Sequence, residues 1–296
     1  MYQQLIRDFV RQEQLPDSYA ADANNWFVPL ISHIENQLSS ASNLPILIGI
    51  NGAQGTGKST LAKLITALLT EKGHNVANLS IDDFYLSKAK RQQLATEVHP
   101  LLVSRGVPGT HDTNQALRTI QALKTASDSD TVILPKFDKS IDDCCTEESW
   151  PSVKGSVNVI ILEGWFVGAR PQDSAELETP INPLESNEDS DGQWRHFVNQ
   201  QLEAHYQIMF SQLDLLIMLK APAFEQVYEW RKLQEQKLRK QAGDAATGLM
   251  NDTEITRFIQ HFERLTRHCL KHLEDKADLV FHLDKNHKVS SQTRRA

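Results

Sequence analysis

The chain has 296 residues, 40% of them hydrophobic, and a formal net charge of −7 at pH 7. A chain of this length can bury one large core or two small ones, and its acidic balance argues against a generic nucleic-acid-binding protein. Three cysteines, an N-terminus without an apolar signal core and no apolar run of membrane-spanning length favour a cytoplasmic protein with reduced thiols and no membrane partner.

Residues 1–44 are expected to form an N-terminal helical extension. Apolar side chains recur there at amphipathic spacing, at Trp26, Phe27, Leu30, Ile31, Ile34 and Leu38. This pattern predicts a helical hairpin or pair that packs on the following domain, and plain core packing accounts for the residues themselves.

A predicted strand at residues 46–50 runs directly into a glycine-rich loop. The loop has the spacing Gly-x-x-x-x-Gly-Lys-Ser, which is typical of a loop that wraps phosphates, because only glycines let backbone N–H groups curl closely around an anion. The residues expected to bind a nucleoside triphosphate are Gly52, Ala53, Gln54, Gly55, Thr56, Gly57, Lys58, Ser59 and Thr60. Within this set, Lys58 is expected to reach the outer phosphates and Ser59 to bind Mg²⁺.

The following residues predict a helix that ends near Gly73, whose N-terminus adds a partial positive charge at the phosphates. No third glycine is present at the spacing of a dinucleotide-binding loop.

Strands and helices alternate through the rest of the chain. Further strands are predicted at 76–81, 131–134, 157–162, 215–219 and 279–283, and helices at about 113–126, 194–212, 223–241 and 252–275. The strands are mostly continuous apolar runs, which favours a parallel sheet covered on both faces. We therefore predict an α/β protein with the P-loop NTPase fold, a three-layer sandwich with a mainly parallel central sheet and a helical lid.

One domain is predicted over residues 45–296. An acidic stretch at about 173–193, rich in Asp, Glu, Ser, Asn and Pro, is expected to be a solvated insertion or mobile loop. The lid is expected at about 223–250, where a cationic helix is followed by a glycine-containing segment.

Acidic residues follow two of the predicted strands. Asp82 and Asp83 come after the strand at 76–81, and Glu163 follows the strand at 157–162. The carboxyl ends of strands in such a sheet lie beside the phosphates, so one aspartate can accept the proton of a substrate hydroxyl, and Glu163 can hold Mg²⁺ or substrate. A helix cap or turn is the alternative role for the aspartates.

The donor nucleotide is expected to be ATP. The Asp-x-x-Gly sequence of GTPases is missing at Glu163, and Pro135 replaces the first residue of the guanine-reading pattern. On the predicted lid, Arg231 is expected to assist catalysis and Arg239 to bind the nucleotide, because cations on a hinged helix can close over phosphates. A solvated basic helix face is the alternative.

The ordered motifs together resemble the D-glycerate 3-kinase family of the phosphoribulokinase, uridine kinase and pantothenate kinase superfamily. The resemblance covers most of residues 45–285 and is carried by the loop at Lys58, by Asp82–Leu86, Arg105–Asp112 and Pro135–Ser140, and by Glu163–Gly168. It implies phosphorylation of D-glycerate at its 3-hydroxyl, with ATP and Mg²⁺, and with Asp82 as the base. The candidate ligands for this small hydroxy acid are Asp83, Tyr85, Arg105, His111, Asp112, Lys136 and Asp138.

Several alternatives stay open at this point. His111 and Asp112 have ordinary roles at a helix start, and the polar set of Lys136, Asp138 and Lys139 can be a solvated loop. The chain also carries Cys144 and Cys145 where the family pattern continues with an arginine. The alternative functions are a kinase for pantothenate or a nucleoside, and a nucleotide-binding ATPase or regulatory module without an acceptor.

Overall fold

A six-stranded sheet forms the centre of the computed structural model, which describes residues 2–41, 44–242 and 251–295, and the side chains of all but 234–242 among them. The strand order is β10-β9-β8-β1-β7-β2, and all neighbours are parallel except β10, which is antiparallel to β9. The strands are β1 (Ile46–Gly52), β2 (Val76–Ser80), β7 (Val159–Gly164), β8 (Leu215–Lys220), β9 (Leu279–Leu283) and β10 (Val289–Arg294). The predicted α/β class with a mainly parallel sheet is confirmed.

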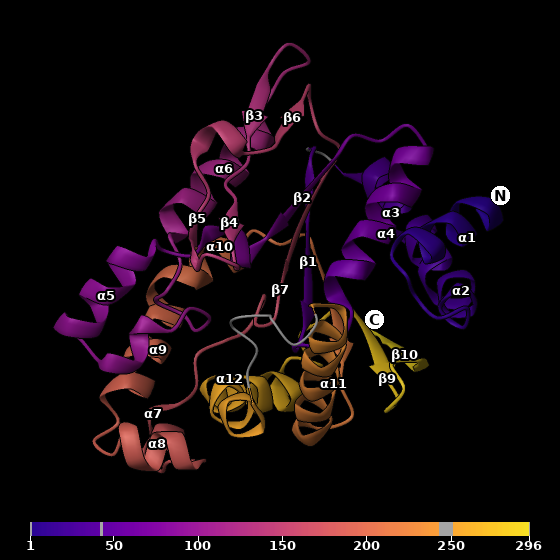
Figure 1. Cartoon of the computed structure of the whole chain (residues 1–296). Coiled ribbons are helices and arrows are strands. Elements are labelled where there is room, and N and C mark those ends of the chain that lie inside the picture. The colour runs from indigo at the N-terminus through magenta and orange to yellow at the C-terminus, as the bar shows by residue number, and fades with distance from the viewer. Residues whose placement is uncertain (1, 42–43, 243–250, 296) are drawn as a thin grey trace.

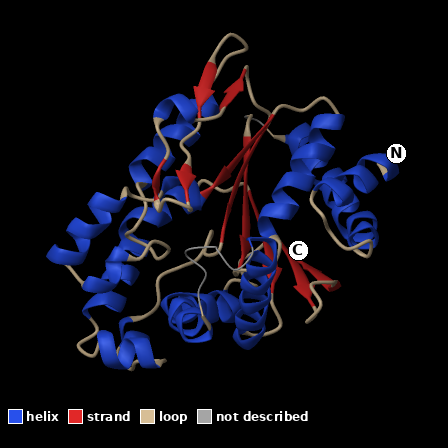
Figure 2. Cartoon of the chain, viewed as in Figure 1, coloured by secondary structure: helices blue, strands red, loops and turns tan. Residues whose placement is uncertain are grey.

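Helices cover both faces of this sheet (Figures 1 and 2). Successive side chains of a strand point to opposite faces, so Ile46 and Ile48 join one core and Leu47 the other. The first core includes α1 (Gln3–Gln12), α3 (Val28–Ser40) and α4 (Lys58–Glu71). The second includes α6 (Thr113–Thr125), α10 (Gln207–Phe210) and α12 (Asp252–His272).

The N-terminal helices share a core with the sheet. Between α1 and α3 lie α2 (Tyr19–Asp22) and a π-helical turn (Ala23–Phe27), whose Phe27 ring packs edge-on against Phe281 of β9 with centroids 5.3 Å apart. The predicted helical extension therefore packs on the sheet, while a domain boundary at residue 44 stays a prediction.

The strand expected at 131–134 does not join the central sheet. β3 (Thr131–Ile133) pairs antiparallel with β6 (Ser152–Lys154) in a separate ribbon, with Ile133 57% exposed. A short run with exposed residues at both ends cannot be covered on both faces, as a parallel strand must be. Our assignment of this run to the parallel sheet was wrong. A second ribbon, β4 (Phe137–Asp138) with β5 (Asp143–Cys144), had no prediction.

The acidic stretch also differs from the solvated or mobile segment that we expected. It forms α7 (Ser174–Leu177) and α8 (Pro183–Glu188), and it buries Glu185 and Asp189 almost completely. Arg264 lies 2.6 Å from Glu185, and Arg195 lies 2.9 Å from Asp189. These carboxylates are buried because each has an arginine partner, without which burial of the charge would be strongly unfavourable.

The remaining helices are α5 (Lys88–Glu97), α9 (Gln193–Gln201), which continues through a π-helical turn (Leu202–Tyr206) into α10, and α11 (Phe224–Ala242). Short 3₁₀ turns lie at Ile81–Phe84, Pro100–Val103 and Glu147–Ser149. In the predicted lid, α11 packs on α12, and residues 243–250 lie outside the described residues. Of the helices described, none is both long and apolar enough to cross a membrane.

Candidate active site

The glycine-rich loop connects the carboxyl end of β1 to the first residue of α4. Gly55 and Gly57 have φ values of +82° and +88°, a left-handed backbone that glycine adopts without a steric penalty. The Thr56 hydroxyl donates to the carbonyl of Ala53 at 2.8 Å and closes the turn. A side chain at Gly55 would place its Cβ 2.8 Å from the Cβ of Trp230 on α11. The loop thus takes the curled shape that presents N–H groups to phosphate at a helix N-terminus.

Glu163 lies beside this loop because β1 and β7 are parallel neighbours, with Ile50 opposite Glu163. Ser59 Oγ donates to Glu163 Oε1 at 2.9 Å, while the other carboxylate oxygen, Oε2, is buried without a hydrogen-bond partner in the described part of the chain. An unpaired buried carboxylate oxygen next to a hydroxyl fits a hard cation such as Mg²⁺. Among the described residues, no group of three or more Asp, Glu, His and Cys side chains could hold a metal ion.

Asp82 lies at the same edge of the sheet, because β2 pairs with β7 and ends at Ser80 opposite Glu163. Its Oδ1 accepts a hydrogen bond from Tyr85 at 2.8 Å, and its Oδ2 accepts one from Lys139 at 2.5 Å. Burial alone would raise the pKa of Asp82, but the charges of Lys139 and Lys58 and the two hydrogen bonds lower it to about 2. The 3₁₀ turn is capped by Ser80 rather than Asp82, so Asp82 is an ionised carboxylate free of that structural role.

Asp83 points to a different partner. It accepts from Lys136 at 2.9 Å and from the backbone N–H of Phe137 at 3.4 Å. These contacts tie the β4–β5 hairpin to the end of β2. Any role of Asp83 or Lys136 toward an acceptor stays a prediction, because in this structure they pair with each other.

Two arginines hold the same hairpin through Asp142. Arg105 donates to Asp142, and Arg91, which is 1% exposed, donates to the Asp142 carbonyl at 2.7 Å and lies 3.0 Å from its carboxylate. Both guanidinium groups lie near the ring of Phe137, at 5.6 Å for Arg105 and 5.9 Å for Arg91. Arg91 and Arg105 therefore bring positive charge to this hairpin from elsewhere in the chain. The segment itself carries Cys144 and Cys145 where the family pattern continues with an arginine.

His111 is brought against Tyr85 by a backbone bridge, and the two rings stack with centroids 4.4 Å apart. Burial lowers the pKa of His111 to about 3, against a smaller opposing effect of Asp82. Asp112 caps α6 by accepting from the N–H of Gln115 at 2.8 Å, the alternative that we left open. Asp138 accepts from the N–H of Ser140 at 2.8 Å in the hairpin turn. Roles in acceptor binding for Asp112 and Asp138 stay predictions.

On α11, Trp230 is buried over the loop and stacks on His287 with centroids 4.2 Å apart. Arg231 lies 5.4 Å from the ring of Phe258 on α12. The side chain of Arg239 lies outside the described residues. The roles of Arg231 in catalysis and of Arg239 in nucleotide binding stay predictions.

Two contacts of the candidate site were not predicted from the sequence. One is the ion pair of Lys139 with Asp82, and the other is the contact of Tyr206 with His111 at 2.7 Å. Lys139 was named only as part of a polar set, and Tyr206 carried no signal because it comes from a helix 95 positions further along the chain.

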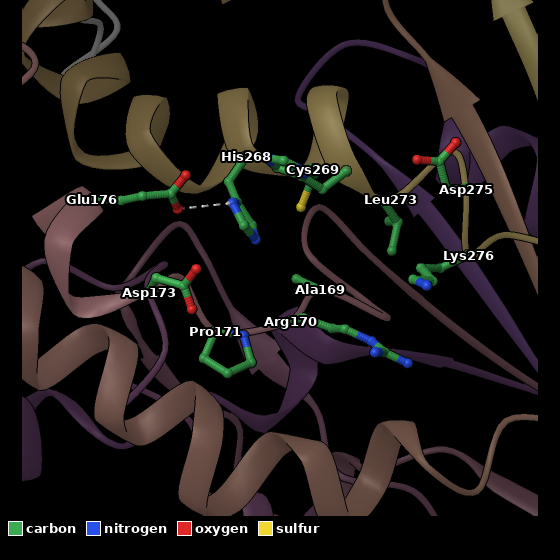
Figure 3. Close-up of a pocket in the computed structure, with 11 residues that line it drawn as sticks. Ala169, Arg170, Pro171, Asp173, Glu176, His268, Cys269, Leu273, Asp275 and Lys276 are labelled. Atoms are coloured by element: carbon green, nitrogen blue, oxygen red, sulfur yellow. Dashed lines mark ion pairs between the residues drawn. The ribbon is translucent and has the colours of Figure 1, made fainter.

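A cavity of about 250 Å³ has a different set of lining residues, which are drawn in Figure 3. It is lined by residues 169–176, which follow β7, and by the end of α12, including His268, which faces Glu176. Because α12 leads into the first residue of β9, this cavity lies toward the amino edge of the strands. It contains none of the residues described above, and the loop, Asp82 and Glu163 lie at the carboxyl edge.

Comparisons with known proteins find a P-loop domain and several kinases as relatives. The KAP family P-loop domain matches residues 27–104. An uncharacterised kinase of Schizosaccharomyces pombe, mug58, is 35% identical over 226 residues, which cover 74% of this chain and 78% of that protein. The chloroplastic D-glycerate 3-kinase of Arabidopsis thaliana is 28% identical over 275 residues, which are 88% of this chain and 57% of the plant protein.

Solved structures give the same fold. The structure of the YGR205w protein has a TM-score of 0.73 and 26% identity, and the match covers 92% of this chain and 98% of that one. A D-glycerate 3-kinase from Cryptococcus neoformans has a TM-score of 0.72 and 24% identity, with 90% and 98% covered, and it supports the fold alone.

Proposed function

This chain belongs to the D-glycerate 3-kinase family of P-loop kinases, and we propose that it transfers the γ-phosphoryl group of ATP to the 3-hydroxyl of D-glycerate, giving 3-phosphoglycerate. The observation that carries the proposal is Asp82, an ionised carboxylate at the strand edge beside the phosphate loop, paired with Lys139 and under the charge of Lys58.

Asp82 is suited to act as the base. A carboxylate offers about four lone-pair sites, and Tyr85 and Lys139 use two of them, so an acceptor hydroxyl can donate to another. As the hydroxyl oxygen bonds to the γ-phosphorus, its proton passes to Asp82, and the bond from that phosphorus to the bridging oxygen breaks to release ADP. Lys58 neutralises charge on the phosphoryl group during this transfer.

Ser59 and Glu163 are the residues that would hold Mg²⁺. When bound, the ion supplies positive charge that orients the outer phosphates and stabilises their charge. The pair fits this role because Glu163 has a buried oxygen without a partner in the described part of the chain.

The cations around Asp82 and Tyr85 suit a small carboxylic acid as the phosphate acceptor. Lys139 pairs with Asp82, and the charge of Arg105 acts on the neighbouring Tyr85. Guanidinium groups match carboxylates in geometry. Arg105 is already engaged by Asp142, which fixes its position and leaves other N–H groups of the guanidinium to donate.

An acceptor screen tests the proposal. ADP release is measured with ATP, Mg²⁺ and, in turn, D-glycerate, pantothenate and uridine. We expect turnover with D-glycerate, and its loss in Lys58→Ala. Turnover with pantothenate or uridine alone would reassign the acceptor within the kinase class. ATP hydrolysis at one rate with every acceptor would instead support a nucleotide-binding ATPase module.

A further inference from the structure

His111 and Tyr206 form a buried pair beside the acceptor side of the candidate site. Tyr206 is fully buried, and its hydroxyl oxygen lies 2.7 Å from Nδ1 of His111. The backbone N–H of Gly109 donates to the same oxygen at 3.0 Å. Nε2 of His111, a residue 6% exposed, is buried and has no hydrogen-bond partner in the described part of the chain.

The hydrogen bonds of this pair decide which ring nitrogen carries the proton. If Nδ1 carried it, the Tyr206 oxygen would accept from both Nδ1 and Gly109, and the hydroxyl proton would have no acceptor among the described residues. Nε2 would then be a second unpaired group. If Nε2 carries the proton, the hydroxyl donates to Nδ1 and only Nε2–H is unpaired. An unpaired buried polar group is unfavourable, so the second arrangement, with one such group instead of two, is favoured.

The surroundings keep both side chains neutral and fixed. Burial lowers the pKa of His111 to about 3 and raises the pKa of Tyr206 above its usual value. The imidazole stacks on Tyr85 at 4.4 Å and lies 5.7 Å from the ring of Phe166. Tyr85 also donates to Asp82, so the histidine ring and the base share one neighbour.

We propose that Tyr206 is a positioning residue that holds His111 as a neutral Nε2–H donor, and that this donor binds the 2-hydroxyl oxygen of D-glycerate. The inference rests on the proposed function for the identity of the acceptor. Asp82 takes the reacting 3-hydroxyl, and the cations Lys139 and Arg105 suit the carboxylate. The uncharged donor is matched to the one remaining oxygen, which is also uncharged.

The proposal gives this pair a role in selectivity. A site that donates to a substrate hydroxyl discriminates against an analogue that lacks it, because the buried donor then stays unpaired. Since Nε2 has no exposed surface here, side chains around it must shift as the acceptor enters, a change of the size common on ligand binding.

Kinetics on two acceptors test the selectivity. The acceptors are D-glycerate and 3-hydroxypropanoate, which lacks only the 2-hydroxyl. We expect the wild-type kcat/KM to favour D-glycerate by roughly 10²–10⁴-fold. Tyr206→Phe should reduce that preference at least about tenfold, mainly through the KM for D-glycerate. Tyr19→Phe is the matched control, because its buried hydroxyl has no partner in the described part of the chain, and it should keep the wild-type preference.

A spectroscopic measurement on the wild-type protein tests the position of the ring proton. It does not depend on whether Tyr206→Phe folds. In ¹⁵N-labelled wild-type protein, the ring signals of His111 are identified by their loss in His111→Gln. We expect Nε2 to be protonated and Nδ1 unprotonated without any ligand. A proton on Nδ1, or an unchanged preference in Tyr206→Phe, would overturn the inference. If the wild type phosphorylates neither acceptor, the proposed function fails together with the assignment of the 2-hydroxyl, while the ¹⁵N signals still decide whether Tyr206 fixes the ring.

Discussion

Glu163→Gln is expected to stabilise the metal-free protein and to impair the magnesium-dependent reaction. Glu163 is 6% exposed, and one of its carboxylate oxygens has no partner in the described residues. Folding therefore buries a charged group whose side chain accepts a hydrogen bond from Ser59. A neutral amide of the same shape removes this charge. We expect a gain of about 1–2 kcal/mol in the free energy of unfolding without metal.

Thermal unfolding in EDTA measures the first effect, which corresponds to a rise of roughly 2–6 °C in Tm. Initial rates over a Mg²⁺ titration measure the second, for which we expect a higher Mg²⁺ requirement and a loss of roughly 10–100-fold in rate at saturation. Glu188→Gln is a matched control, because its carboxylate is 41% exposed and paired with Arg257, so its stability should change by less than about 1 kcal/mol and its rate should not change. A Glu163→Gln protein that is less stable in EDTA, or that keeps the wild-type Mg²⁺ dependence, would refute the reasoning.

Three further perturbations follow from individual contacts. Lys139→Met should raise the pKa of Asp82 from about 2 by about 1–3, so that kcat/KM between pH 4 and 6 falls relative to its value at pH 7. Lys139→Arg is the control and should keep the wild-type pH profile. Identical pH profiles for the wild type and Lys139→Met would exclude a role of the ion pair in the reaction. Gly55 has a φ of +82°, and an added Cβ there would contact Trp230, so Gly55→Ala should lower stability by about 1–3 kcal/mol and weaken ATP binding. Gly73 has a φ of +87° and open space around it, so Gly73→Ala measures the backbone strain alone. Equal losses in the two alanine variants would argue against the contact with Trp230. Arg264→Met leaves Glu185 buried without its cation and should cost about 3–5 kcal/mol in denaturant unfolding, with kcat unchanged; a change below about 1 kcal/mol would contradict a packed acidic segment.

The parts of the fold that the sequence predicted are those with local or repetitive signals. The loop from Gly52 to Ser59 is defined by residue spacing within one turn, so no long-range contact is needed to recognise it. Asp82 and Glu163 converge for a different reason, since parallel strands bring their carboxyl ends to one edge of the sheet. Acidic residues directly after two buried strands could therefore be placed together.

The parts that escaped prediction depend on partners distant in the chain. The β4–β5 hairpin has only two residues in each strand, too few to show a period, yet it carries Lys139 to Asp82. Tyr206 reaches His111 from a turn 95 positions further along the chain, on the same side of the sheet, and nothing in its local sequence marks it. The acidic segment looked solvated by composition, because composition does not reveal that Arg195 and Arg264 lie next to its carboxylates.

The product formed by Asp82→Asn, compared with that of the wild type, tests the central claim most directly. Both proteins are incubated with ATP, Mg²⁺ and D-glycerate and followed by ³¹P NMR, with ATP binding measured in parallel. The wild type should form ADP and 3-phosphoglycerate, and Asp82→Asn should bind ATP equally well but turn over roughly 10²–10⁴-fold more slowly. A wild-type rate in Asp82→Asn, or a wild type that releases only inorganic phosphate, would contradict the assignment.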